Sequence, residues 1–331
     1  MSARQSIRPP TRQLTRRPAP VLAADAVLPG RRPSWARIPA AAVRTARPRQ
    51  WPKNLLVFAA PLTGSALARG STALSGATAA LAVFTLASCA VYFVNDSVDA
   101  ERDRQHPRKC LRPVACGDLG ERQALALAAG CVLAAAALTA ATGLLATGYG
   151  LALALTAYLA TSFLYSFGLK HLPVIELALV ASGFVLRALG GAAASRVPPS
   201  AWFILVCSLG ALLVVIAKRY TEITSLGGPA ARHRPSLRRY TPRGLRAAQR
   251  AAALLMVAAY LAWAATEPDT WAGHWHLATA VPLVCALVRF DRLTATATTA
   301  HIEDLIVRDV PMVCFEAVWL LVFVVGLATH P

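Results

Sequence analysis

The sequence is dominated by apolar runs that are each close to the length needed to cross a bilayer. A transmembrane helix requires about 20 predominantly apolar residues. Of the 331 residues, 56% are hydrophobic and 15% are charged, whereas a soluble domain carries roughly 25% charge. We therefore predict an all-α polytopic membrane protein with nine transmembrane helices. The predicted spans are 54–69, 77–95, 123–142, 144–165, 172–194, 200–217, 248–266, 274–290 and 311–329.

Basic residues predict how the chain is oriented in the membrane. The formal net charge is +18, and residues 1–46 form an Arg- and Pro-rich arm that we expect to be disordered. With nine spans, loops 96–122 and 218–247 lie on the same side as this arm and are rich in Lys and Arg. The loops on the other side contain one basic residue, Arg196. The positive-inside rule then places the N-terminus in the cytoplasm. We expect residues 47–331 to form the domain that lies in the plasma membrane. The charge suits anionic lipid, so we expect no nucleic-acid partner.

The seven cysteines do not predict a disulfide framework. Five lie in or beside apolar runs, where cysteine behaves as a small hydrophobic residue. Cys110 and Cys116 lie in a basic loop without the histidines of a typical zinc site. We expect them to be structural.

The second apolar run ends in an acidic stretch, VNDSVDAERD. Offsets of three, four and seven place Asp96, Asp99 and Asp103 on one face of a helix. Acids at the mouth of an apolar helix are costly unless they are neutralised. Mg²⁺ bound to a diphosphate would neutralise them. The alternative is a solvated helix end whose aspartates pair loosely with the neighbouring arginines.

Further polar groups lie at the same predicted side of the membrane. Cations beside the aspartates suit the spare oxygens of a metal-bound diphosphate. An ordinary basic flank is the alternative for Lys53, and a helix-surface ion pair is the alternative for Lys218 and Glu222. The candidate phosphate and substrate ligands are Lys53, Asn54, Asn95, Lys109, Arg112, Tyr165, Lys170, Lys218, Arg219 and Glu222.

Two ionisable residues, Glu176 and Arg187, lie inside one apolar run. Ionisable groups within a membrane span are candidates for function. Eleven residues correspond to roughly 16 Å along a helix, which is too far for a direct ion pair. Each therefore needs another partner, and we expect Arg187 to contact substrate or metal. The segments RPSLRRYTPRGLR and HIEDLIVRD are interpreted as a basic loop, or a lid, and a surface helix.

Four motifs occur in the order RPRQWPKNLLVFAAPL, VNDSVDAERDRQHPRKCLRP, YSFGLKHLPVIELALVASGFVLRALGG and AKRYTEI. Together they resemble the UbiA superfamily of intramembrane prenyltransferases. The resemblance covers roughly residues 44–329 and is closest to the decaprenyl-phosphate phosphoribosyltransferase branch. The last motif differs from most of the superfamily, which carries a second aspartate-rich motif there, and this difference fits a donor with an extra 5-phosphate.

The resemblance implies a function and a set of site residues. The expected donor is 5-phosphoribosyl 1-diphosphate, the acceptor is a polyprenyl (decaprenyl) phosphate, and the cofactor is Mg²⁺. The product would serve cell-wall arabinan synthesis. Asp96, Asp99 and Asp103 would be the catalytic metal ligands, and residues 47–331 the catalytic domain. Oligomerisation with further copies of the chain is left open.

Three competing functions remain at this point. A prenyltransferase would move a prenyl group from its diphosphate to an aromatic or other small acceptor. A transporter would be expected to carry internal repeats and charges near the membrane midplane, but no clear repeat is present. A non-catalytic lipid-binding protein would not require a metal.

Overall fold

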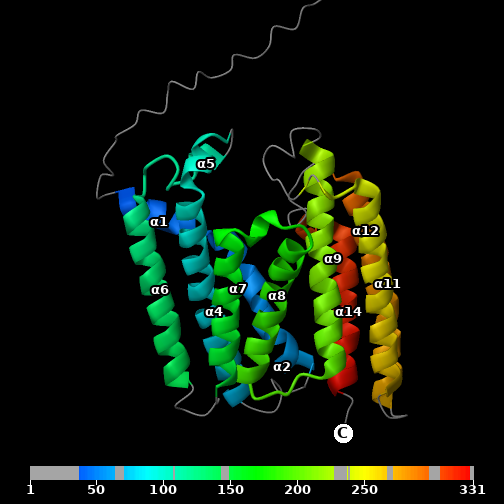
Figure 1. Cartoon of the computed structure of the whole chain (residues 1–331). Helices are drawn as coiled ribbons and strands as arrows, with labels where there is room; N and C mark the ends of the chain where they lie inside the picture. The colour runs from blue at the N-terminus through cyan, green and yellow to red at the C-terminus, as the bar shows by residue number, and fades with distance from the viewer. Residues whose placement is uncertain are drawn as a thin grey trace, which may run out of the picture.

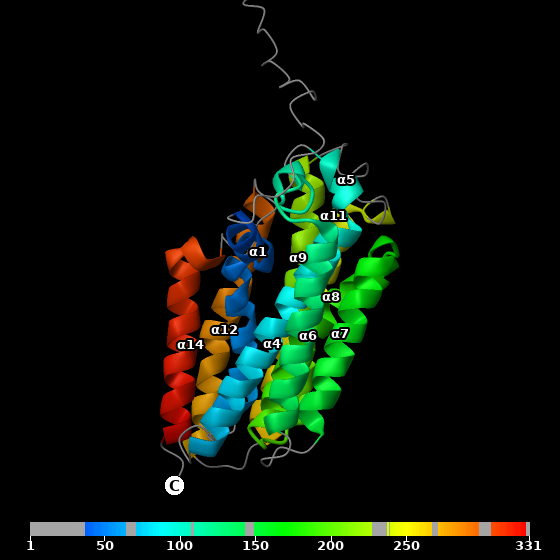
Figure 2. The same cartoon turned by 90° about the vertical axis from the view of Figure 1, so that its left-hand side faces the viewer.

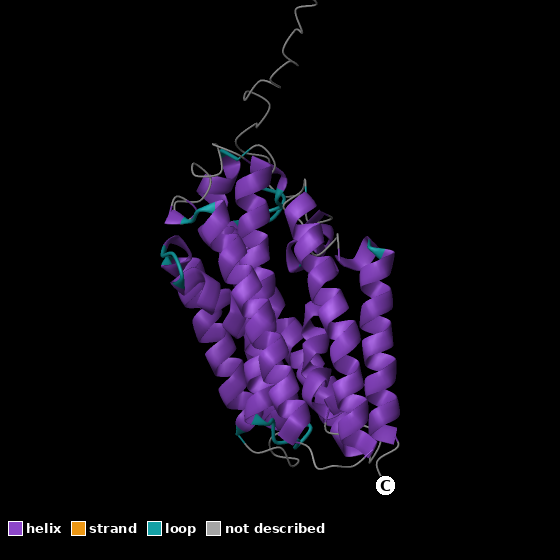
Figure 3. Cartoon of the chain, turned by 90° about the vertical axis from the view of Figure 1, so that its right-hand side faces the viewer, coloured by secondary structure: helices purple, strands orange, loops and turns teal. Residues whose placement is uncertain are grey.

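The computed structural model describes residues 37–63, 71–106, 109–142, 149–226, 237, 239–266, 271–297 and 306–328. All regular structure in these ranges is helical, and they contain no strand (Figure 3). The long helices run side by side, with the short helix α5 (Ala100–Arg104) at one end of the bundle (Figure 1). We refer to this as the α5 end. The predicted all-α helical fold is confirmed.

Eight of the nine predicted spans coincide with long helices. Six described helices, α4, α6, α7, α8, α9 and α11, are long and apolar enough to cross a membrane, so the exact count of nine is not established. The eight helices are α4 (Ser71–Val98), α6 (Glu121–Thr142), α7 (Gly150–Phe167), α8 (Ile175–Ala194), α9 (Ala201–Leu226), α11 (Pro242–Thr266), α12 (Trp271–Thr296) and α14 (Val310–Ala328).

The first predicted span does not form a regular α-helix. It begins as a 3₁₀-helix, η3 (Pro48–Phe58), and continues as the short helix α2 (Ala59–Thr63). Pro52 lies inside η3, and a proline lacks the N–H donor that an α-helical turn requires. Residues 64–69 of the predicted span lie outside the described residues.

Part of the predicted disordered arm is helical. Helix α1 (Ile38–Ala46) packs against α4, and its Ala41 is fully buried. The expectation of disorder is therefore wrong for residues 38–46, whereas residues 1–36 lie outside the described part of the chain. Arg47 follows α1 in the left-handed conformation, with φ of 52°, and joins α1 to η3.

The predicted basic loop 218–247 is shorter than expected. Helix α9 continues to Leu226, and α11 begins at Pro242. Lys218, Arg219 and Glu222 therefore lie on a helix that extends beyond the apolar run. The arginines at 232, 234 and 238 lie outside the described residues.

The helices pack mainly against their neighbours in sequence. Helix α4 contacts α1, η3, α6, α7 and α8, while α9 joins this group to α11, α12 and α14 (Figure 2). Phe84 of α4 and Tyr158 of α7 meet edge to face with ring centroids 5.5 Å apart. Before α14, Arg289 donates hydrogen bonds of 2.9 and 2.6 Å to Asp309, which lower the pKa of this carboxyl. All seven cysteines are free, as expected.

Candidate active site

The acidic stretch forms the last turn of α4 and the start of α5. The backbone N–H of Asp99 donates to Asn95, and that of Asp103 donates to Asp99. Helical hydrogen bonding therefore continues through the junction between the two helices. Asp96 and Asp103 are buried, whereas Asp99 is partly exposed.

Arg112 links two of the three aspartates. Its Nη1 lies 3.2 Å from Asp96 Oδ1 and 2.6 Å from Asp103 Oδ2. The offset of seven residues thus brings these two carboxylates to one side of the helical stretch. A second guanidinium reaches Asp96 from Arg47, with Nη2 2.5 Å from Oδ1, and also lies over the ring of Tyr92.

Asp99 forms an ion pair with a different basic side chain. Its Oδ1 lies 2.5 Å from Nζ of Lys170, which is buried in the short 3₁₀-helix η6 (Leu169–His171). Beside this pair, Arg102 contacts His171 at 2.9 Å. The aspartates therefore pair with cations from distant elements. The loose pairs expected with Arg102 and Arg104 do not occur among the described contacts, because Arg104 binds Glu101 and Glu121.

The donor set suits a hard cation, although its present arrangement is not that of a complete metal site. No group of three His, Cys, Asp or Glu residues converges in the described ranges. The oxygens of Asp96 and Asp103 meet around one guanidinium nitrogen, so a single positive centre can interact with both carboxylates. Carboxylate oxygens are also the ligands that Mg²⁺ prefers. We conclude that the carboxylates of Asp96 and Asp103 fit a magnesium ion if the Arg112 guanidinium moves away from them.

A second charged cluster crosses from α8 to α9. Arg219, which is buried, donates to Glu176 at 3.1 Å and to Glu222 at 2.7 Å, and it interacts electrostatically with Tyr165 of α7. Glu222 therefore binds Arg219 in addition to any contact with Lys218, which is half-buried on the same helix. Because Glu176 lies six residues after Lys170, η6 connects this cluster to the aspartates.

Arg187 lies in a separate buried network. Its guanidinium donates to Asn54 Oδ1 at 2.7 Å, to Ser88 Oγ at 3.0 Å and to the hydroxyl of Tyr158 at 2.9 Å. A fourth bond goes to the carbonyl oxygen of Gly183. Four protein acceptors thus surround the guanidinium. The structure brings Arg187 and Asn54 to each other, and their described contacts do not include the aspartates.

The remaining predicted ligands are half-buried around the α5 end. Asn95 lies in the last turn of α4, and Lys53 lies in η3. Lys109 begins the 3₁₀-helix η4 (Lys109–Leu111), where its backbone N–H donates to His106. The basic segment before α11 also reaches the site region, because the Tyr240 hydroxyl accepts from the backbone N–H of Val174 at the start of α8.

Sequence reasoning missed two notable residues. Arg47 was quoted within a motif but was not proposed as a ligand, although it contacts Asp96. Its position just before the first span, among other cations, was the available signal. Glu316 lies in an apolar span and lines a cavity of about 540 Å³ among α9, α11, α12 and α14. A single acid inside an apolar span was the signal there.

Comparisons with known proteins place this site in a family. A model described as the UbiA prenyltransferase family matches residues 56–303. The chain belongs to the UbiA family. The decaprenyl-phosphate phosphoribosyltransferase of Mycobacterium tuberculosis is 37% identical over 290 residues, covering 86% of this chain and 93% of that protein. Its counterpart from Corynebacterium glutamicum is 36% identical over 293 residues, covering 87% of each chain.

Solved UbiA homologues share the fold. The structure of a homologue from Archaeoglobus fulgidus bound to GPP and Mg²⁺ matches with a TM-score of 0.65 and 14% identity, covering 87% of this chain and 100% of that one. The apo structure of a homologue from Aeropyrum pernix matches with a TM-score of 0.55 and 21% identity, covering 82% and 96%. The chain is therefore a multi-pass membrane transferase of the UbiA family, and the predicted family, fold and enzyme class are confirmed.

Proposed function

We propose that the protein transfers the 5-phosphoribosyl group from 5-phosphoribosyl 1-diphosphate to a polyprenyl phosphate such as decaprenyl phosphate. Relatives at 36–37% identity carry the name of this activity. The observation that carries the proposal is the meeting of Asp96 and Asp103 around Arg112, with Arg47 and Lys170 beside them. Carboxylates for a metal and cations for phosphate oxygens are both required by a metal-bound diphosphate.

Asp96 and Asp103, with Asp99 nearby, would hold Mg²⁺. The bound ion supplies positive charge that neutralises the diphosphate leaving group. In the structure three cations, Arg47, Arg112 and Lys170, pair with the three aspartates. Binding of a metal and a diphosphate together would let the aspartates exchange cation partners for metal, while the side-chain cations bind phosphate oxygens.

The candidate ligands form two groups, one for each phosphorylated end of the donor. Lys170, Arg112, Arg47, Lys109 and Lys53 would bind the diphosphate. Arg219, Lys218 and Tyr165 would hold the 5-phosphate, with Glu222 and Glu176 orienting Arg219. Asn95 and Asn54 remain candidate ligands from the motifs. For Arg187 we propose an indirect part, because its described hydrogen bonds all go to protein acceptors.

The reaction needs no assigned general base. An oxygen of the acceptor phosphate, which is already anionic, forms a bond to C1 of the ribose while the bond from C1 to the diphosphate oxygen breaks. Electrostatic stabilisation of the departing diphosphate is the main contribution expected from the site. The electron pair of the broken bond leaves with the diphosphate, so no proton has to be removed from the acceptor.

The acceptor chain has a suitable apolar environment. The cavity of about 540 Å³ among α9, α11, α12 and α14 is lined mainly by apolar side chains, including Met256 and Phe290. Helix α9 contributes Gly210 and Leu213 to this cavity and carries Arg219 nearer its end. A polyprenyl chain lying there would place its phosphate toward the α5 end.

We also propose that the α5 end faces the cytoplasm in the plasma membrane. The cations of the site, and the basic residues of the segments that connect helices there, lie at this end. An excess of Lys and Arg in short loops marks the cytoplasmic side. This orientation would give the site access to a water-soluble, phosphorylated donor.

Donor identity separates this proposal from prenyl transfer. Purified protein in lipid nanodiscs is incubated with Mg²⁺ and decaprenyl phosphate plus ribose-labelled 5-phosphoribosyl 1-diphosphate. A parallel sample receives a labelled prenyl diphosphate and an aromatic acceptor. We expect label to enter lipid only in the first sample. Label transfer in the second sample alone would overturn the proposal in favour of a prenyltransferase.

A further inference from the structure

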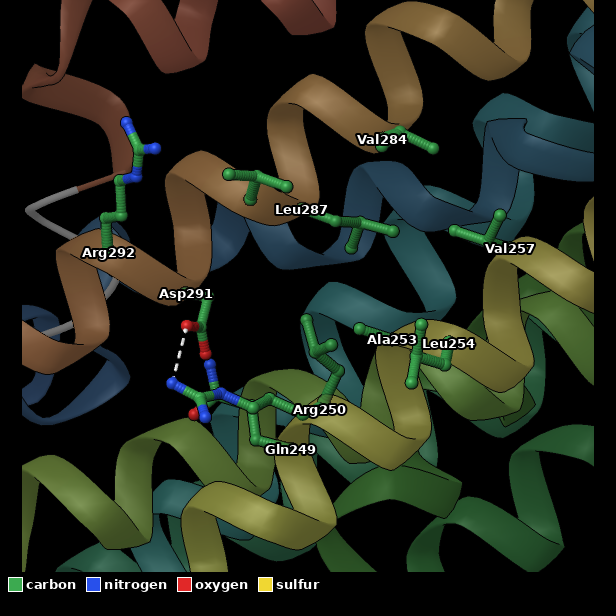
Figure 4. Close-up of a pocket in the computed structure, with 11 residues that line it drawn as sticks. Gln249, Arg250, Ala253, Leu254, Val257, Val284, Leu287, Asp291 and Arg292 are labelled. Carbon is green, nitrogen blue, oxygen red and sulfur yellow. Dashed lines mark hydrogen bonds and ion pairs between the residues drawn. The ribbon is translucent and has the colours of Figure 1, made fainter.

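A second binding region lies on the outer side of the bundle between α11 and α12. A groove of about 330 Å³ runs along these helices (Figure 4). Its floor and sides are apolar and include Leu213, Ala253, Val257 and Leu287. Leu254, which lines the groove, is 72% exposed. The groove therefore opens toward the surroundings of the helix bundle, where a lipid chain can enter it.

One end of the groove is polar. Arg246 donates to the carboxylate of Asp291 at 2.7 Å and to its carbonyl oxygen at 3.0 Å. Arg250 also reaches this carboxylate, but at 3.5 Å. Figure 4 shows Arg250 and Asp291 facing each other across the end of the groove. Arg246 is the closer partner of Asp291, because it makes two hydrogen bonds to this residue, whereas Arg250 lies 3.5 Å from the carboxylate.

Two guanidinium groups remain in excess at this end. The side chain of Arg250 is 64% exposed. Arg292 is exposed, lines the groove and has no ion pair within the described ranges. Three arginines and one carboxylate therefore lie in this part of α11 and α12, with the Arg292 guanidinium turned away from Asp291 and Arg250 (Figure 4). This surplus is complementary to an anionic group, and an arginine can bind a phosphate through two parallel hydrogen bonds.

The apolar and basic parts are arranged along the helix axes. On α11 the groove extends from Arg250 to Val257, and on α12 from Asp291 back to Val284. Seven residues of helix correspond to roughly 10 Å. The ligand that matches this arrangement has a phosphate at one end and a hydrocarbon chain that follows the helices toward the middle of the membrane.

We propose that this groove binds an anionic membrane phospholipid, with its phosphate at the exposed Arg250, an acyl chain between α11 and α12, and Arg292 adding positive charge at the same end of the groove. The groove is separate from the aspartate site, whose described side chains come from α4, α5, η6 and the segments around Arg47 and Arg112. The groove shares Leu213 and Leu287 with the cavity proposed for the acceptor chain, but its basic end at Arg250 and Arg292 is not part of that cavity. This proposal does not depend on the reaction that the protein catalyses.

Lipid titration of the purified, delipidated full-length protein tests the proposal. Native mass spectrometry would compare phosphatidylglycerol with phosphatidylcholine of the same acyl chains. We expect the first to bind about tenfold more tightly, since each Arg or Lys near an anionic lipid surface contributes to attraction. Arg250→Gln combined with Arg292→Gln should remove this preference. Arg37→Gln combined with Arg122→Gln changes the net charge equally at exposed positions on α6 and beside α1 and should preserve it.

A second variant separates the groove from general surface attraction. Ala253→Trp would fill the groove while leaving both arginines in place, so binding of phosphatidylglycerol should fall by a similar factor. Equal affinity for the two lipids in the wild-type protein, or an unchanged preference in the double Arg250 and Arg292 variant, would overturn the proposal. So would tighter binding of decaprenyl phosphate than of phosphatidylglycerol, which would make the groove an acceptor site.

Discussion

At the scale of single residues, the site is built from carboxylates that form ion pairs with basic side chains. Asp96 and Asp103 share Arg112, and Asp99 holds Lys170. A buried carboxylate without a partner is costly, and removing one member of a buried ion pair is strongly destabilising. In the structure each of the three carboxylates therefore has a cationic partner. The cationic side chains are also well placed to bind phosphate oxygens when a metal ion binds the carboxylates.

The first prediction concerns Asp96. Asp96→Asn removes one negative charge from the group that we propose as the metal ligands, so phosphoribosyl transfer should fall by about 100-fold or more. The measurement is the initial rate of labelled lipid formation by purified protein. Glu101→Gln is the matched control, because Glu101 lies on the same segment but is exposed and pairs with Arg104. Wild-type turnover by Asp96→Asn would contradict the proposed role.

The second prediction concerns Arg187. Arg187→Met leaves the buried Asn54 and Ser88 without their shared donor, and we expect a loss of about 2–3 kcal/mol in the free energy of unfolding. Arg187→Lys should not restore stability, because an ammonium cannot reproduce the planar set of donors. Thermal unfolding in detergent measures both. Unchanged stability together with a raised KM for the donor would instead indicate direct substrate contact.

At the scale of elements, close packing of η3 on α8 positions the segment that carries Lys53 and Asn54. A Cβ added at Gly191 would lie against the backbone carbonyl of Val57 in η3, and one added at Gly190 would meet the ring of Phe84. Glycine permits this approach because it has no side chain. Gly191 therefore allows η3 to pack on α8, and Gly190 allows α4 to do so.

The third prediction compares two glycines. Gly191→Ala should push η3 away from α8 and lower the free energy of unfolding by about 1–3 kcal/mol. Gly130→Ala is the control, because nothing lies within 4 Å of a Cβ at that exposed position of α6, and it should stabilise by roughly 0.5–1 kcal/mol. Thermal unfolding should shift in opposite directions. Equal shifts would show that the contact between Gly191 and η3 is unimportant.

The elements differ in how well sequence alone predicts them. Long apolar runs predicted eight helices, because burial in a membrane requires both apolar side chains and internal hydrogen bonding. Hydropathy did not reveal that the first run is a 3₁₀-helix, since this depends on the prolines and on packing against Gly191. Helix α1 was missed for a related reason. It has only nine residues and follows an Arg- and Pro-rich segment, and it packs against α4.

At the scale of the whole molecule, α8 and α9 join the part that carries the aspartates to the part that contains the apolar cavity. Arg219 bridges these helices by binding Glu176, which is fully buried. The regions proposed for the donor and the acceptor therefore meet at a junction that contains a buried ion pair.

The fourth prediction tests this junction. Glu176→Gln removes the fully buried carboxylate and should lower the free energy of unfolding by about 1–3 kcal/mol, with Glu222 still bound to Arg219. Glu222→Gln should cost less because its side chain is 20% exposed. Denaturation of both variants in detergent gives the comparison. A larger loss for Glu222→Gln would show that the ion pair within α9 is more important than the bridge.

The site as a whole could be predicted only in part. Asp96 and Asp103 could be paired from their spacing, because seven residues make nearly two helical turns. The pairings with Arg47 and Lys170 could not, since Arg47 lies 49 residues from Asp96, and Lys170 lies 71 residues from Asp99. The same holds for Arg187, whose bond to Asn54 spans 133 residues. Such contacts arise from tertiary packing and leave no periodic signal.

The most direct test of the central claim is the mass of the lipid that purified protein makes from 5-phosphoribosyl 1-diphosphate and decaprenyl phosphate, with Mg²⁺ or with excess EDTA. We expect a product heavier by one phosphoribosyl group with Mg²⁺, its loss in EDTA and its return when Mg²⁺ is restored. No such product with Mg²⁺, or equal amounts of it in EDTA, would contradict the account of a metal-dependent phosphoribosyltransferase.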